Sequence, residues 1–233
     1  MYIPAIRSDV VAENGGNPDW NVLRNASKPH ADIYSIMDLA PEHEAKASEY
    51  AISEYETQIL DMWDEFYRGI DVKVIGFPVW SEEFGKTNDY SELPDWKKGF
   101  IMKNRELYLR NRVFLDKWLK KHGNLEWCVP THRKLEWQAG SDYPSIYDCI
   151  IQFRPSGVRV KRPDKFSTLV AMNHPQIVGK YRRRLTPDES KRLQSFPDSY
   201  ELHPSDGTAL KQIGNSVNVT VLKAIFTELK TYF

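Results

Sequence analysis

The residues best suited to catalysis or metal binding are few in this chain, which has two cysteines and six histidines among 233 residues. Cys128 and His132 stand four residues apart, but nothing nearby completes a set of metal ligands, so we expect a structural role for both. His203 and Ser205 fall in a predicted loop without an acidic partner, which gives no support for a Ser-His-Asp triad. The sequence also has no glycine-rich phosphate or dinucleotide loop. It therefore contains no self-sufficient catalytic centre.

Charge is distributed unevenly along the chain, although the net charge is zero. Residues 32–92 carry 15 Asp/Glu against 4 Lys/Arg, whereas residues 152–192 carry 11 Lys/Arg against 3 Asp/Glu. A basic block of this density indicates a polyanionic partner for one face of the protein. The alternative is two solvated faces of opposite sign, and charge alone leaves both interpretations open.

The spacing of apolar residues predicts the helices and strands that must position the cysteines, histidines and charged residues. A spacing near that of a helix predicts helices at about 41–68 and 95–122, each followed by a glycine that ends it. We expect their aromatic residues to form core, and the many carboxylates of the first helix to form a solvated face. Short apolar or alternating runs predict strands at 2–7, 72–79, 125–129, 134–138, 147–154, 157–161 and 166–172.

Two more helices are predicted near the C-terminus. Thr186 can cap the first of them, a proline suits its first helical position, and Glu189 completes a capping box. The last helix is expected to begin after Asn215 and Ser216, which would cap it, and Gly214 before them would permit a tight turn. Its apolar face is predicted from Val217, Val221, Leu222, Ile225, Phe226 and Leu229.

Composition places the chain among globular proteins, with 41% hydrophobic and 27% charged residues. No apolar run approaches the ~18 residues of a membrane span, and the first residues lack the layout of a signal peptide. Two cysteines cannot cross-link a domain of this size, so we predict a protein of the reducing cytoplasm, with no membrane partner.

The C-terminal third resembles the cytosine-5 DNA methyltransferase family. Residues 183–198 (RRLTPDESKRLQSFPD) resemble its ninth conserved motif, and residues 211–217 (KQIGNSV), with an apolar helix after them, resemble its tenth, in the family's order. Upstream, residues 156–169 look like the target-recognition segment, in which a Thr-Leu pair precedes the ninth motif. Residues 2–7 resemble the strand that ends the eighth motif. The resemblance covers the whole chain and is most specific from about residue 150 onward.

The departures from the family pattern are as informative as the matches. The family's methyl transfer needs a cysteine after a proline, and none of the 14 prolines here precedes a cysteine. The Glu-Asn-Val that holds the flipped base is missing, because Glu13 and Asn14 are followed by Gly15. The Phe-x-Gly-x-Gly loop that binds S-adenosylmethionine is also missing. This pattern resembles the second polypeptide of a split enzyme, whose partner carries motifs one to seven.

The resemblance implies a fold and a division of the chain. The fold is α/β, with an incomplete Rossmann-like methyltransferase lobe, reduced to a C-terminal strand and helix, plus a mixed α+β target-recognition domain. Residues 1–30 would complete the eighth motif, 31–180 would form the target-recognition domain, 181–200 the ninth motif, and 201–233 the tenth motif, returning to the catalytic lobe. The small lobe of the family reads the major groove while the target cytosine is flipped out.

The resemblance also implies binding residues for double-stranded DNA and for S-adenosylmethionine, which would be shared with the partner. Side chains that pair with base edges or hold phosphates supply the DNA set: Arg159, Lys161, Arg162, Lys165, Thr168, Leu169, Asn173, Gln176, Arg183 and Arg184, with His174 beside them. At least one arginine of 182–184 is expected to make an internal salt bridge. Asn215, Ser216 and Val217 are the cofactor candidates, for which helix capping alone is the alternative role.

Three functional hypotheses remain open at this point. The first is a non-catalytic subunit of a restriction–modification or solitary methyltransferase, inactive without its partner. The second is a free-standing sequence-specific DNA-binding protein, and the third is the remnant of a once-continuous enzyme. The sequence indicates no role for the acidic helix at 41–68, for which a spacer and a partner contact both remain open.

Overall fold

The computed structural model describes residues 32–40, 43–71, 75–171 and 176–230, and it divides into two compact units. Residues 39–167 and 174–185 form one unit, which we call the sheet unit. Residues 1–38, 168–173 and 186–233 form the other, which we call the helical unit. The strand predicted at 2–7 lies outside the described residues, and the assignment of the chain to motifs and domains stays a prediction.

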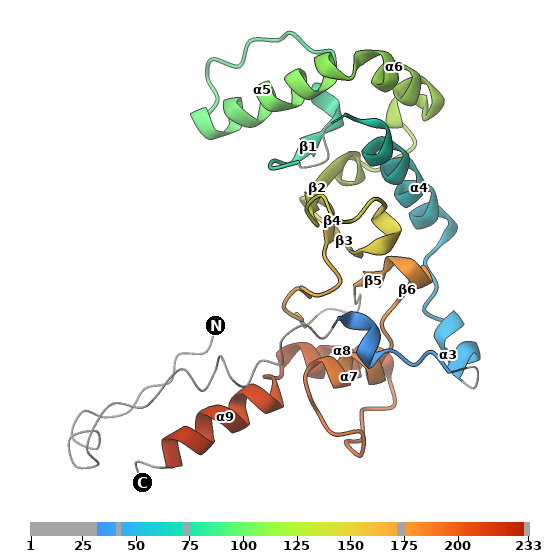
Figure 1. The fold of residues 1–233 in the computed structure, drawn as a ribbon, viewed down its shortest axis with the longest axis vertical. Coiled ribbons are helices and arrows are strands. Elements are labelled where there is room, and N and C mark those ends of the chain that lie inside the picture. Colours follow the sequence, from blue (N-terminus) through green and yellow to red (C-terminus); the bar gives the residue numbers. More distant parts are fainter. Residues whose placement is uncertain (1–31, 41–42, 72–74, 172–175, 231–233) are drawn as a thin grey trace, which may run out of the picture. The chain divides into compact units, whose positions relative to one another are not determined.

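Six strands of the described residues form one mixed sheet in the sheet unit (Figure 1). Its order is β1-β2-β4-β3-β5-β6, with β2 and β4 parallel and the other neighbours antiparallel. Together with the helices, this sheet confirms the α/β class. The strands are β1 (Val79–Trp80), β2 (Lys134–Gln138), β3 (Ile150–Arg154), β4 (Gly157–Lys161), β5 (Ile177–Val178) and β6 (Arg183–Arg184).

Alternation along the central strands gives the sheet one apolar face. Leu135 and Trp137 of β2 are buried, as are Val158 and Val160 of β4, because successive side chains of a strand point to opposite faces. Helix α4 (Glu54–Gly69) contributes to the same hydrophobic core, and the rings of its Tyr67 and Trp137 stack with centroids 3.5 Å apart. Removing this apolar surface from water is the main stabilisation of the unit.

The helix predicted at 41–68 is in fact two helices, α3 (Glu44–Ser48) and α4. Between them the backbone amide of Ile52 donates to the carbonyl of Arg182 at 3.0 Å, so this segment pairs with the chain next to β6. Ser53 then starts α4 with a capping box, in which its side chain accepts from the Glu56 amide and the Glu56 carboxylate accepts from the Ser53 amide. A tertiary contact and a local cap together break the predicted helix.

The carboxylates of α4 form the expected solvated face only in part, since Glu54 and Asp61 are exposed but the others are not. Asp64 is buried and accepts from the Ser145 hydroxyl at 2.6 Å and from the Ile146 amide at 2.8 Å. Glu65 accepts from Lys121 at 2.7 Å, at the end of α6 (Arg112–Lys121). The acidic helix therefore anchors neighbouring elements of its own unit, which is a role that its sequence did not indicate.

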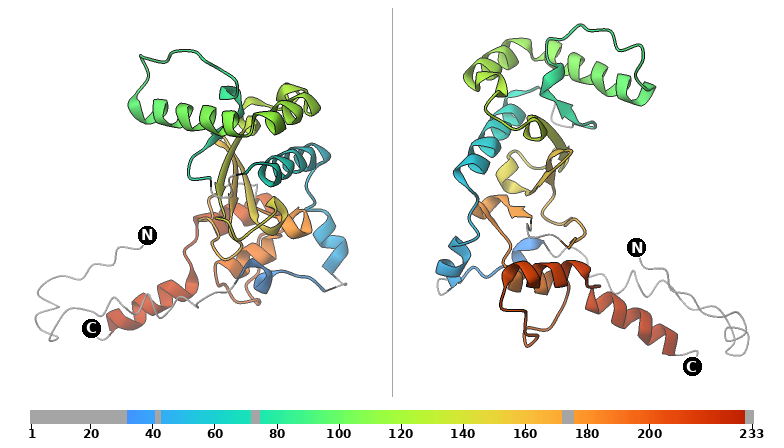
Figure 2. Two further views of the ribbon diagram at one scale, coloured as in Figure 1. Left: turned by 45° about the horizontal axis from the view of Figure 1, so that its top comes forward. Right: turned by 180° about the vertical axis from the view of Figure 1, so that it is seen from behind.

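The helix predicted at 95–122 is also divided, into α5 (Asp95–Arg110) and α6. Asn111 departs from helical geometry at φ −112° and ψ 21°, because its side chain is bound on both sides. Its oxygen accepts from the Asp71 amide at 2.9 Å and its nitrogen donates to the Leu107 carbonyl at 3.0 Å. Helix α5 contacts β1, and α6 contacts α4 (Figure 2).

The predicted strands have mixed outcomes. Those at 134–138 and 157–161 are confirmed at their predicted bounds as β2 and β4. The run 147–154 keeps only β3, and the run 72–79 keeps only the start of β1 within the described residues. The strand at 125–129 is wrong, because a 3-10 turn (Gly123–Leu125), in which Asn124 and Leu125 take left-handed backbone angles, occupies its start. Residues 166–171 form no regular element in the described structure, so the strand predicted at 166–172 is wrong there.

The helical unit contains the 3-10 turn η1 (Ile33–Ile36) and the helices α7 (Pro187–Leu193), α8 (Asp206–Asn215) and α9 (Val219–Leu229). The capping box of Thr186 and Glu189 is confirmed. Helix α8 was not predicted, since its apolar positions are few. In the part of the chain that the structure describes, no helix is long and apolar enough to cross a membrane.

The last helix begins after Asn215 and Ser216, as expected, but the prediction that these two residues cap it is wrong. Asn218 caps α9, its side chain accepting from the Val221 amide at 3.1 Å. Asn215 is the last residue of α8, and the Ser216 hydroxyl donates to the Ile213 carbonyl at 2.6 Å, so it closes α8 instead. Gly214 is likewise helical and makes no turn.

Candidate nucleic-acid interface

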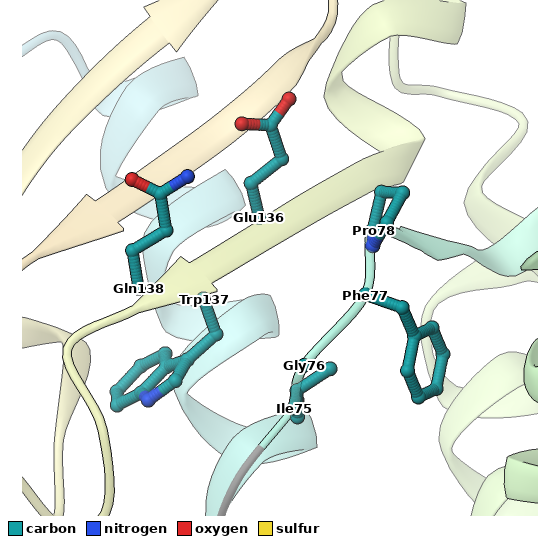
Figure 3. A pocket seen from close by; sticks show the side chains of 7 residues that line it. All are labelled: Ile75, Gly76, Phe77, Pro78, Glu136, Trp137 and Gln138. Carbon is teal, nitrogen blue, oxygen red and sulfur yellow. The ribbon is translucent and has the colours of Figure 1, made fainter.

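The side of the sheet opposite the apolar core carries polar side chains of three adjacent strands. Strand register places Glu136 of β2 beside Arg159 of β4, and Arg159 beside Gln152 of β3. These residues alternate with the buried ones, so they share one face. Figure 3 shows Glu136 and Gln138 on one side of β2 and Trp137 on the other. We define the polar sheet face as Glu136, Gln138, Gln152, Arg154, Arg159 and Lys161.

One carboxylate and three cations lie together on this face. Oxygen Oε2 of Glu136 accepts a hydrogen bond from Nε of Arg159 at 2.7 Å, and it forms ion pairs with Nη2 of Arg159 at 2.6 Å and with Nη1 of Arg154 at 4.0 Å. Burial lowers the pKa of Lys161, and the charges of Arg159 and Arg154 lower it further. Because the cations outnumber the carboxylate, the face can accept an added anion or hydrogen-bond acceptor.

Arg162 is engaged differently, just beyond the end of β4. It donates to Asp142 at 2.8 Å and to Asp164 at 3.0 Å, and lies over the Tyr143 ring at 5.3 Å. Hydrogen bonds to Asp164 and Asp142 raise the pKa of Arg162, and the same contact lowers the pKa of Asp164. Two carboxylates compensate the charge of Arg162, and the side chain links the loop around Asp142 to the turn at Asp164. Lys165, which follows, is exposed.

The remaining predicted DNA residues are divided between the units. Thr168 is exposed and Leu169 half-buried, and both belong to the helical unit. Asn173 and His174 lie outside the described residues. Gln176 is buried in the sheet unit, and its side-chain oxygen has no hydrogen-bond partner in the described structure. The structure thus brings Arg159 and Lys161 together on one face but does not gather the full predicted set there.

The arginine run 182–184 holds the edge of the sheet. Arg184 forms a short ion pair with Glu56 of α4, and Arg182 stacks over the Tyr147 ring at 4.1 Å and lies 3.8 Å from Asp61. Arg183 is buried and donates to the Arg184 carbonyl at 2.9 Å. The expectation that at least one of these arginines makes an internal salt bridge is confirmed.

Residues of the predicted ninth motif organise the helical unit. Glu189 is buried, and besides completing the capping box it accepts from the Asp38 amide at 2.8 Å. Arg192 donates to the carboxylates of Asp38 at 2.7 Å and of Asp198 at 3.0 Å. Lys191 donates to two carbonyls of the loop after α7. The polar residues of this segment therefore connect the chain around η1 and the loop after α7 to α7 itself.

The three cofactor candidates lie at the junction between α8 and α9. Asn215 and Val217 are exposed, while the hydroxyl of Ser216 is used to close α8. Gly214 lies against the backbone of Val170 in the same unit, and a Cβ atom at this position would overlap the Val170 carbonyl. A glycine is needed here because of that close approach.

Several residues of the polar sheet face escaped sequence reasoning, namely Glu136, Gln138, Gln152 and Arg154. The alternation of 134–138 predicted a polar side for that strand. Glu136 lies beside Arg159, however, only because β2 and β4 pair in parallel and bring together residues 23 positions apart in the sequence. No local sequence pattern indicates such a pairing.

The family model and the related proteins that match this chain are all DNA methylases or methyltransferases. The family model described as C-5 cytosine-specific DNA methylase matches residues 26–231. The chain is 39% identical over 138 residues to Type II methyltransferase M.AluI of Cellulosimicrobium cellulans, across 58% of this chain and 26% of that protein. It is 55% identical over 47 residues to Type II methyltransferase M.HgiCI of Herpetosiphon aurantiacus, across 20% of this chain and 11% of the relative.

A third relative, Type II methyltransferase M.HhaI of Haemophilus parahaemolyticus, is 47% identical over 49 residues, across 21% of this chain and 15% of its own. No solved structure matches the chain. The chain thus spans about a quarter of M.AluI and less of the other two. The family match nevertheless extends over most of the 233 residues, and the chain belongs to the C-5 cytosine-specific DNA methylase family.

Proposed function

We propose that this chain is the DNA-recognition subunit of a split DNA cytosine-5 methyltransferase that moves a methyl group from S-adenosylmethionine to cytosine C5 in duplex DNA. A partner polypeptide supplies the catalytic cysteine, the base-gripping Glu-Asn-Val and most of the cofactor pocket. The assembly is a heterodimer of a cytoplasmic restriction–modification or solitary methylation system. Alone, the chain transfers no methyl group.

The state of the two cysteines carries this proposal. Cytosine C5 becomes nucleophilic only after a thiolate adds at C6, so the enzyme needs an accessible, ionisable cysteine. Cys128 and Cys149 are both buried, and burial raises the pKa of Cys128 to about 11 and the pKa of Cys149 to about 12. Neither follows a proline. Both are inert structural thiols, and the reacting thiolate comes from outside these 233 residues.

DNA binding by this chain is supported by the cation excess of the polar sheet face. Arg154, Arg159 and Lys161 share this face with a single carboxylate, and a surface with this balance attracts phosphate or acceptor-rich base edges. Arg184 and Arg162, which the sequence also suggested, are held by carboxylates of the chain itself. We therefore assign those two to the support of the recognition domain.

The cofactor contact is proposed at Asn215, Ser216 and Val217. The exposed side chains of Asn215 and Val217 leave this junction open to a ligand, and the residues offer an amide and an apolar surface of the kind that borders a methionine moiety. Bound S-adenosylmethionine supplies the transferred methyl group. Three residues at one open junction border such a molecule without enclosing it, which fits a pocket completed by the partner.

We propose that the partner packs on the apolar side of α9, so that α9 forms the last helix of the Rossmann-like lobe. Phe226 is 55% exposed there and Val217 is also exposed. Ile225 on the same helix is already buried, so an acid at position 225 would destabilise this chain itself. Phe226→Asp is the better interface variant, since it places a charge in the joined core but disturbs no side chain that is buried now.

The test measures tritiated methyl transfer to duplex DNA by the purified chain, by a partner carrying the Pro-Cys and cofactor motifs, and by their mixture. We expect activity in the mixture only, co-purification of the two chains, and loss of both with Phe226→Asp. Methyl transfer by the single chain that disappears with Cys128→Ala would refute the proposal. Sequence-specific DNA binding by the chain, with no activity in any mixture, would favour the free-standing DNA-binding protein.

A further inference from the structure

The contact between Glu136 and Arg159 fixes the orientation of one guanidinium group. The two residues face each other directly across the parallel pair β2–β4. A single oxygen, Oε2 of Glu136, accepts a hydrogen bond from Nε of Arg159 at 2.7 Å and lies 2.6 Å from its Nη2 as an ion pair. The side chains are only 17% and 23% exposed, so the attraction between them is less screened than at an open surface. The arginine is held by one edge in a defined plane.

That arrangement leaves the other edge of Arg159 available. A guanidinium has five N–H donors on a planar fork, and Glu136 uses those of the Nε side. Within the part of the chain that the structure describes, Nη1 of Arg159 has no hydrogen-bond partner. The edge formed by Nη1 and Nη2 is the one that pairs with O6 and N7 of guanine in the major groove.

A purely structural cross-strand pair is the simplest alternative, but two further observations disfavour it. Such a pair would be neutral, whereas Arg154 adds a second cation 4.0 Å from the same carboxylate, and Lys161 on the same face is close enough to both arginines to be affected by their charges. Nη1 of Arg154 is buried and has no hydrogen-bond partner in the described structure. The cluster therefore lacks an acceptor, and guanine in duplex DNA provides two acceptors side by side.

We propose that Arg159 reads a guanine of the target sequence and that Glu136 is the positioning residue that holds it for this contact. The inference rests on the proposed function, since it requires that the polar sheet face meets duplex DNA. Glu136 also lines a hollow of about 350 Å³, together with residues 75–78, Trp137 and Gln138 (Figure 3).

Recognition of a base and simple attraction by charge predict different effects, and three variants of the full chain distinguish them. Arg159→Lys keeps the charge but loses the fork that makes two parallel hydrogen bonds. Glu136→Gln keeps the size of the side chain but removes the charge that holds the arginine. Arg110→Lys is the matched control, because Arg110 also pairs with a carboxylate, that of Asp71 at 3.4 Å, on an exposed part of α5.

Each protein selects from a randomised duplex library, and bound sequences are counted beside the total affinity at fixed salt. The wild-type chain is expected to select a site with guanine at one position. Arg159→Lys should lower the preference for that guanine by about tenfold, in line with one bidentate pair, and change total affinity little. Glu136→Gln should lower the same preference yet raise affinity for all sequences, because a negative charge near DNA is removed. Arg110→Lys should change neither quantity.

Every other outcome counts against a stated part of the proposal. An unchanged base preference in Arg159→Lys overturns the guanine contact, and equal weakening on all sequences assigns Arg159 to phosphate instead. If Glu136→Gln raises duplex affinity but leaves the guanine preference unchanged, Glu136 only repels DNA through its charge and does not position Arg159. In these cases methyl transfer by the mixture would persist and the proposed function would stand. No duplex binding by the wild-type chain, and no activity with the partner, would overturn the proposed function itself. Thermal melting of each variant identifies loss of folding.

Discussion

The ion pair between Glu56 and Arg184 gives the sharpest stability prediction for the sheet unit. Glu56 lies in the first turn of α4 and Arg184 in the edge strand β6, so their contact joins residues 128 positions apart. The Glu56 carboxylate also accepts from the Ser53 amide at 3.0 Å and from the Ser53 hydroxyl at 3.1 Å. We choose Glu56→Gln because it removes the charge while retaining nearly the same shape.

The expected loss follows from the burial of the pair. The two side chains are 16% and 20% exposed, and Nε of Arg184 is already buried without a hydrogen-bond partner in the described structure. Removing one partner of a fully buried pair costs roughly 3–5 kcal/mol. Residual solvent contact and a partly retained cap reduce this to about 2–3 kcal/mol. At the usual entropy of unfolding for a chain of this size, the Tm falls by about 4–12 °C.

The same contact makes the loss depend on pH in a defined direction. Burial acts to raise the pKa of Glu56, but hydrogen bonds from Arg184 and from the Ser53 amide outweigh it, and the pKa lies below its ordinary value of 4.5. A carboxyl with a lowered folded-state pKa stabilises the fold above the unfolded-state value and loses that contribution as pH falls through the folded-state value. The difference between wild type and Glu56→Gln is therefore full at neutral pH and shrinks below about pH 4.5.

The assay is thermal unfolding followed by circular dichroism, at neutral pH and at several acidic values. Glu54→Gln is the control, since Glu54 stands in the same first turn of α4 and is exposed. It should shift the Tm by at most about 1–2 °C, as expected for an exposed charge. Equal Tm values for the two variants, or a Glu56→Gln deficit that stays constant far into acid, would refute the reasoning.

Three further predictions concern the helical unit and the thiols. Gly214→Ala should destabilise the helical unit by about 1–3 kcal/mol in thermal melts, because the added methyl would overlap the Val170 backbone; a neutral or stabilising effect would contradict the close approach. Asn218→Ala should cost about 1 kcal/mol through loss of the α9 cap, and an unchanged Tm would show that this cap is dispensable. Cys128→Ala and Cys149→Ala should leave the rate of tritium transfer by the assembled enzyme unchanged apart from any loss of folded protein; a rate reduced more than tenfold with normal melting would assign chemistry to a thiol.

The sequence by itself determined the features that depend on neighbouring residues. The capping box of Thr186 and Glu189 joins groups three residues apart, so it could be predicted from residue types alone and it formed as expected. The alternation of 134–138 and 157–161 likewise fixed two strands at their predicted bounds. The motif resemblance of the C-terminal third agreed with the family match.

Tertiary structure alone decided what depends on distant partners. Pairing of the Ile52 amide with Arg182 interrupts the first predicted helix, and the hydrogen bond from Asp71 to Asn111 interrupts the second. Helical periodicity continues through both breaks, so local patterns could not place them. The approach of Glu136 to Arg159 is of the same kind, because it requires β2 to lie parallel to β4 in one register. A shift of that register by one residue would turn one of the two side chains to the opposite face, since side chains alternate along a strand with period two.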